Sequence, residues 1–140
     1  MDETRLLPLL DLAARHTADA ASGVVRCRSQ SATEHARLEQ LGSYLADYDT
    51  HSARASRWQL VNRAAFLANI HTAIEQQRQA VDRAHEAVDR AVEDWNRLRT
   101  EQRRYETLLA RERRRRSVLA AHREQRTLDD VSTRHLRPDP

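Results

Sequence analysis

The sequence is poor in the residues that break or turn a chain. Its 140 residues include two glycines and three prolines, and the prolines lie near the ends, at positions 8, 138 and 140. Sheets need frequent turns, which glycine and proline usually supply, so a sheet protein is excluded. Long uninterrupted helices are the architecture that needs so few breakers.

Aromatic residues, cysteine and long apolar runs are also scarce. Aromatic residues make up 4% and hydrophobic residues 39% of the chain, which leaves little material for a broad core. The single cysteine, Cys27, excludes an intramolecular disulfide and a thiolate-rich metal site. No apolar run approaches the roughly 20 residues of a membrane span, and the first residues are acidic where a signal peptide is basic. We therefore expect a cytoplasmic protein.

The residue patterns of catalysis are missing as well. With glycine only at positions 23 and 42, no P-loop or other glycine-rich phosphate cradle can form. The seven histidines never occur as a His-x3-His pair on one helical face, and no acidic residue is placed where burial would turn it into a general acid or base. We predict a non-enzymatic protein with no catalytic, cofactor-binding or metal site.

What the sequence does contain is a heptad repeat and one basic stretch. When position a is placed at every seventh residue from Leu60 to Arg116, and d from Arg63 to Leu119, thirteen of the eighteen positions are apolar. Such a period lets a helix present a continuous apolar seam to a partner helix. The formal net charge is only +3, yet residues 97–126 hold eleven arginines and four acids.

A weaker a/d pattern from Leu10 to Tyr48 supplies the partner helix. It is interrupted at Ser31 and Glu34, and it lapses before Trp58, where hydroxyl side chains can cap helix ends. The sequence therefore predicts a single all-α coiled-coil protein. Its expected parts are a first helix over 9–48, a turn over 49–57, a second helix over 58–130 and a flexible tail over 131–140.

Folding back at the turn gives an antiparallel two-helix coiled-coil hairpin, in which residues whose numbers add up to about 110–112 lie side by side. Leu10 then faces residue 101, and everything beyond about Gln102 is predicted to lack an intramolecular partner. The arginine-rich part of the second helix would thus form an overhang. A homodimer through the same seam stays an alternative to a monomer, because a and d residues do not reveal which chain supplies the partner helix.

Two aromatic residues fall outside the seam. Tyr44 and Phe66 both occupy g positions, which face each other along one flank of an antiparallel pair. They either pack on each other and widen the core, or leave an apolar patch of the kind that marks a binding site for a partner.

Several segments, taken in order and spacing, resemble the flagellar type III export protein family FliJ. They are LEQLGSYLADY at 38–48, FLANIHTAIEQQRQAV at 66–81 and EQRTLDD at 124–130, with Trp95 in mid-helix. The resemblance spans most of the chain. It implies a hairpin similar to the rotor stalk of rotary ATPases, placed at the cytoplasmic face of the inner membrane at the flagellar base.

The resemblance also implies three kinds of partner: the hexameric export ATPase FliI, whose ring assembly and activity the protein would promote, the export gate protein FlhA, and export chaperones that carry substrates. No nucleic acid is expected, and the membrane is reached only through the export apparatus. By match to the family, the gate-binding face comprises Leu41, Tyr44, Tyr48, Phe66, Ile70, Ala73 and Gln77. From the residues themselves, the candidate ATPase contact is the overhang, with Leu108, Leu109, Arg111, Arg113, Arg114, Arg115, Arg116, Val118 and Leu119.

Two other functions compete with this one. The corresponding stalk protein of a virulence type III secretion system shares the plan, although the pattern of Tyr44, Tyr48 and Phe66 favours the flagellar system. A protein of another class would bind nucleic acid through the basic helix. This is less favoured because basic-zipper proteins place the basic region before the zipper, and a base-reading asparagine is missing here.

Overall fold

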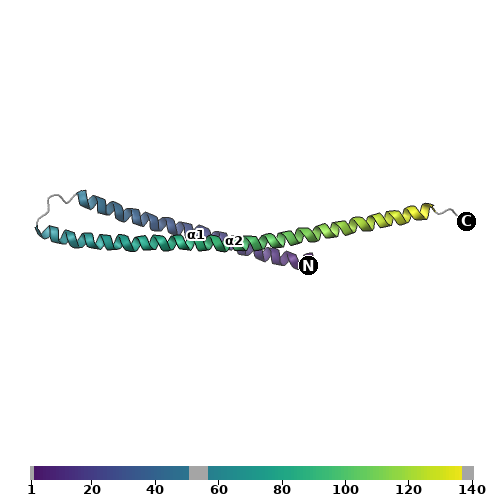
Figure 1. Cartoon of the computed structure of the whole chain (residues 1–140), viewed down its shortest axis with the longest axis horizontal. Helices are drawn as coiled ribbons and strands as arrows, with labels where there is room; N and C mark the ends of the chain where they lie inside the picture. Colours follow the sequence, from purple (N-terminus) through teal and green to yellow (C-terminus); the bar gives the residue numbers. More distant parts are fainter. Residues whose placement is uncertain (1, 51–56, 137–140) are drawn as a thin grey trace. The chain divides into compact units, whose positions relative to one another are not determined.

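The structure is a computed structural model that describes residues 2–50 and 57–136. These residues form two α-helices, α1 (Glu3–Thr50) and α2 (Arg57–Leu136), and no strand occurs among them (Figure 1). The all-α prediction is confirmed. Most of the turn predicted at 49–57 lies outside the described residues.

The chain divides into two compact units, each built from a stretch of both helices. The hairpin unit comprises Ala18–Asn96, and the terminal unit comprises Met1–Thr17 with Arg97–Pro140. In each unit α1 and α2 pack against each other in antiparallel directions, as the paired contacts below show. The predicted two-helix hairpin is therefore confirmed.

In the hairpin unit the buried residues follow the predicted heptad. Every a and d position from Ala20 to Tyr48 on α1, and from Arg63 to Trp95 on α2, is buried or half-buried. The apolar side chains at the centre of this seam are Val24, Ile70, Ile74, Val81 and Ala84, all less than a tenth exposed. Burying each large aliphatic side chain contributes roughly 1.5–3 kcal/mol, so this seam is the main stabilising feature of the unit.

The first helix begins earlier than the sequence predicted. α1 starts at Glu3 rather than at residue 9, and Pro8 lies inside it. The Asp2 carbonyl accepts the backbone amides of the residues three and four positions on, at 3.0 and 3.1 Å. Aspartate is a favoured N-cap, and an acidic first turn suits the positive end of the helix dipole. Pro8 removes one backbone donor on the exposed side of this end, a loss that the cap and the packing below it offset.

The second helix also extends past its predicted end. It continues to Leu136, so the part of the predicted flexible tail at 131–136 is helical. No glycine or proline occurs between Trp58 and Arg137, and nothing in this stretch ends a helix. Residues 137–140 lie outside the described residues.

The pairing of the helices in the terminal unit reaches further than predicted. Leu109 and Glu112 are buried on α2, and Leu6, at 1% exposed, is buried on α1. The prediction that pairing ends near Gln102 was therefore wrong. Two causes account for the difference: α1 is longer at its start, and side chains on a helix lean toward that helix's own N-terminus, which turns long α2 side chains back toward the start of α1.

An overhang is nevertheless present. All residues of α2 from 117 to 136 are exposed, and α2 continues past the first residues of α1 in this unit (Figure 1). The predicted overhang is thus shorter and starts after Arg116 rather than after Gln102.

Candidate interaction sites

An aromatic cluster lies on one flank of the hairpin unit, where α1 and α2 face each other. The ring of Phe66 lies 4.6 Å from that of Tyr48 and 6.3 Å from that of Tyr44, measured between centroids, and both pairs are tilted. Phe66 and Tyr48 are half-buried, whereas Tyr44 is 61% exposed. The first alternative is confirmed for the packing of the rings, because Phe66 contacts both tyrosines, while the ring of Tyr44 stays in solvent.

The other residues predicted for the gate-binding face differ in their accessibility. Ile70 is buried in the seam, and Leu41, Ala73 and Gln77 are half-buried. The accessible part of this face is therefore Tyr44 with the edges of its neighbours. Ile70 acts as support beneath the cluster and does not itself offer a surface to a partner.

Gln77 is engaged inside the hairpin. Its Nε2 atom donates to the Glu34 backbone carbonyl at 2.9 Å and to the Glu34 carboxylate at 2.6 Å. The same carboxylate accepts hydrogen bonds from Gln30 at 2.9 Å and from Arg37 at 3.2 Å. Glu34, one of the two buried polar residues that interrupt the apolar pattern of the sequence, thus forms a satisfied polar layer with Gln77 in the seam. Such a layer fixes the register of a coiled coil, because a shifted pairing would leave the buried carboxylate unmatched.

A histidine pair, which was not predicted from the sequence, joins α1 and α2 on the flank opposite the aromatic cluster. The Nε2 atoms of His35 and His85 lie 2.7 Å apart, and the rings meet edge to face at 4.8 Å between centroids. One ring nitrogen donates and the other accepts. Both residues occupy e positions, which face each other in an antiparallel pair as g positions do. Histidine spacing along a single helix does not reveal a pair that joins two helices.

The candidate ATPase contact in the terminal unit separates into buried and exposed residues. Leu109 is 6% exposed and belongs to the seam, so its assignment as a contact residue is not supported by its position. Leu108, at 40% exposed, lies beside two shallow hollows of about 430 and 460 Å³ that it shares with Thr100 and Arg104. Val118 and Leu119 are exposed as well.

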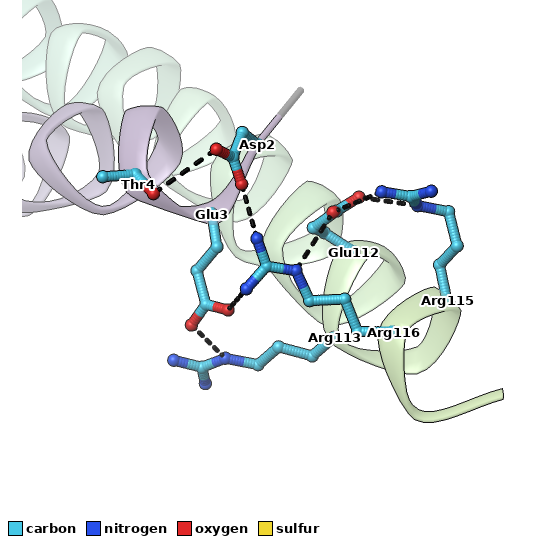
Figure 2. A network of polar contacts seen from close by, with 7 residues as sticks. All are labelled: Asp2, Glu3, Thr4, Glu112, Arg113, Arg115 and Arg116. Atoms are coloured by element: carbon cyan, nitrogen blue, oxygen red, sulfur yellow. Dashed lines mark hydrogen bonds and ion pairs between the residues drawn. The ribbon is translucent and has the colours of Figure 1, made fainter. Parts of the chain in front are cut away.

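Three of the predicted arginines are held by acidic residues (Figure 2). Arg113 Nε donates to Glu3 at 3.1 Å, and Arg116 donates to Glu3 at 3.3 Å and to Asp2 at 2.5 Å. Arg115 makes a forked pair with Glu112 of its own helix, at 2.7 and 3.0 Å. We call the contact of Asp2 and Glu3 with Arg113 and Arg116 the acidic clasp. The sequence analysis missed it because it placed residues 1–8 outside the first helix.

Glu112 anchors this network from α2. Its carboxylate also lies 3.5 Å from Arg116 Nε. The hydrogen bond from Arg115, with the positive charges of Arg115 and Arg116, holds the pKa of the Glu112 carboxyl below its ordinary value of 4.5, against the opposing effect of desolvation. The same hydrogen bond raises the pKa of Arg115.

The lowered pKa predicts how stability changes with pH. A carboxyl group whose pKa is lower in the folded state contributes stability above its unfolded pKa and loses that contribution as pH falls through the folded value. The unfolding midpoint of the wild-type protein should therefore fall more steeply below about pH 4.5 than that of Glu112→Gln. Urea unfolding followed by circular dichroism between pH 3 and 7 measures this. Parallel pH profiles for the two proteins would contradict the assignment.

Within residues 2–50 and 57–136 no group of three or more His, Cys, Asp or Glu side chains is arranged to hold a metal ion. Neither α1 nor α2, as far as they are described, contains a window apolar enough to cross a membrane.

The fold and these surfaces define a class of protein: a coiled-coil hairpin that presents a supported aromatic ring in one unit and an arginine-rich helix in the other. The family model described as Flagellar FliJ protein matches residues 1–138 of the chain. The chain belongs to the flagellar FliJ family and is a component of the flagellar type III export apparatus. A comparison with curated proteins finds no match.

Proposed function

We propose that this protein is a non-enzymatic part of the export apparatus that binds the ATPase ring FliI, promotes its assembly and activity, and links it to the gate protein FlhA. It also interacts with export chaperones, escorts them, and in this way serves flagellar assembly, motility and chemotaxis. Its place is at the cytoplasmic face of the inner membrane at the flagellar base. Family membership across residues 1–138 is the observation that carries the proposal.

The aromatic cluster supports a contact with the gate. Tyrosine is enriched among the residues that dominate binding energy, because it combines a large apolar ring with a polar tip and loses little entropy when ordered. Tyr44 is exposed, and Phe66 lies beneath it at 6.3 Å. A ring that is already positioned by its own helix pair needs little rearrangement to bind.

The arginine-rich segment supports a contact with the ATPase ring. Guanidinium groups match carboxylates through paired hydrogen bonds, so an acidic ring lining is the expected complement. Among the described residues, Arg111 and Arg114 are exposed and form no ion pair. With exposed Leu108, Val118 and Leu119 nearby, the segment offers both charge and apolar area.

Tyr44→Ala separates the two contacts. It should weaken gate binding about thirtyfold or more, the effect of losing a dominant interface residue, while stimulation of the ATPase stays at the wild-type level. Affinity is measured by calorimetry with the purified gate domain, and the ATPase rate at concentrations that form the ring. Val25→Ala, an equally exposed apolar position on α1, is the matched control. If ATPase rates are equal with and without the wild-type protein, the proposed function is wrong.

A further inference from the structure

The acidic clasp places two carboxylates on two arginines of the segment proposed to bind the ATPase. Arg116 bonds both Asp2 and Glu3, and Arg113 bonds Glu3 (Figure 2). The geometry is set from both sides. On α1, Leu6 is fully buried one turn after the two acids and fixes their position. On α2, Glu112 forms ion pairs with Arg115 and Arg116.

We propose that Arg113 and Arg116 form a docking surface for an acidic segment of a partner protein, and that Asp2 and Glu3 occupy this surface in the free protein as an internal competitor. The partner segment presents adjacent carboxylates and displaces the clasp when it binds. This inference deepens the proposed ATPase contact and rests on it only for the identity of the natural partner.

The clasp is weak enough to be displaced. The side chains of Arg113, Arg116 and Asp2 are 58%, 51% and 55% exposed, and that of Glu3 is 22% exposed. Ion pairs at such exposure are screened by water and salt, and each changes an equilibrium constant by only about 1.5-fold to fivefold. Arg116 is also held by Glu112 of its own helix, at 3.5 Å. A partner with more carboxylates meets arginines that are already positioned, at a small cost for releasing Asp2 and Glu3.

The present occupant indicates which chemistry the surface accepts. Both groups that the start of α1 places against Arg113 and Arg116 are carboxylates, one at the N-cap and one in the first turn. Arginine forks bind carboxylate and phosphate alike, so a nucleic acid is the competing ligand. The observed contacts favour an acidic polypeptide, since the spacing of the arginines matches two carboxylates on successive residues.

The test measures binding of synthetic polyglutamate to the full chain at low salt by fluorescence anisotropy. In Asp2→Asn/Glu3→Gln the clasp is lost, and affinity should rise about threefold to tenfold, as expected for the release of two or three exposed ion pairs. The matched control is Asp11→Asn/Asp19→Asn, which removes the same charge from exposed positions of α1 outside the clasp and should change affinity less than twofold.

A second variant is needed because the removal of Asp2 and Glu3 also removes the acids that stabilise the first turn of α1. Arg113→Gln/Arg116→Gln leaves the Leu109 seam intact and should bind polyglutamate about tenfold less tightly than the wild type. Equal affinities for the clasp variant and its control would overturn the proposal, as would unchanged binding by the arginine variant. A gain by the clasp variant for duplex DNA but not for polyglutamate would also overturn it.

The same variants distinguish the inference from the function on which it rests. If the clasp variant gains affinity for polyglutamate but no variant binds the ATPase, the docking surface stands and the ATPase contact fails. If the ATPase binds the wild type and the clasp variant equally, with the arginine variant weakened, the ATPase contact stands and the competition by Asp2 and Glu3 is wrong.

Discussion

Gln77→Leu is expected to lower the free energy of unfolding by about 1.5–3 kcal/mol, the usual effect of removing a hydrogen bond to a buried charged group. The carboxylate of Glu34 would keep its bonds to Gln30 and Arg37 of its own helix but lose the hydrogen bond that Gln77 donates to it from α2. Urea unfolding followed by circular dichroism measures the change. Gln76→Leu is the control, because the side chain of Gln76 is exposed and its replacement should change stability little.

The double variant Glu34→Leu/Gln77→Leu completes this experiment. Replacing both partners of a buried hydrogen bond with apolar groups can be nearly neutral or stabilising, so the double variant should recover the wild-type stability or exceed it. Its helices should pair less specifically, which size-exclusion chromatography with light scattering would detect as mixed association states. If Gln77→Leu and Gln76→Leu unfold at the same urea concentration, the polar layer does not stabilise the hairpin.

Leu109→Ala is expected to destabilise the protein by about 2–4 kcal/mol, whereas Leu108→Ala should cost less than about 0.5 kcal/mol. The two leucines are adjacent, but Leu109 is 6% exposed in the seam and Leu108 is 40% exposed beside the shallow hollows. Thermal and urea unfolding of the two variants compares the positions directly.

The same pair of variants tests the division between core and contact in the terminal unit. Leu108→Ala should weaken ATPase binding without changing stability. Leu109→Ala should lower the stability but leave ATPase binding unchanged under conditions in which the variant is folded. Equal stability losses would show that the seam does not extend to residue 109, and the end of helix pairing would then lie near Gln102 after all.

The heptad pattern predicted most of the hairpin because each a or d residue carries independent information. A polar residue at one seam position, such as Arg63 or Gln77, does not change the register, because Ile70, Ile74 and Val81 support it independently. The polar positions Ser31 and Glu34 were recognised as interruptions. Their role was not, since a glutamate at d is explained only by the glutamine opposite, and that pairing depends on the exact alignment of two helices.

The ends of the helices were predicted less well. The first helix was predicted to start at residue 9, and Pro8 lies inside α1 although proline is unfavourable inside a helix. The bonds to the Asp2 carbonyl and the burial of Leu6 outweigh this preference, and the burial depends on α2 being in place. The acidic clasp was missed for the same reason. Asp2 and Glu3 look like ordinary surface acids in the sequence, and their contact with Arg113 and Arg116 can be predicted only when α1 is known to start at Glu3.

The end of helix pairing near Arg116 has a mechanical consequence. The described residues 117–136 form a single helix of about 30 Å, at about 1.5 Å per residue. The resistance of a rod to bending rises steeply with its thickness, so a lone helix yields before a pair of helices does. Bending under a load applied along residues 117–136 would therefore be concentrated near Arg116, where the pairing of α2 with α1 ends. The four side chains of the acidic clasp lie at this place, and their ion pairs can separate and re-form without breaking the helix.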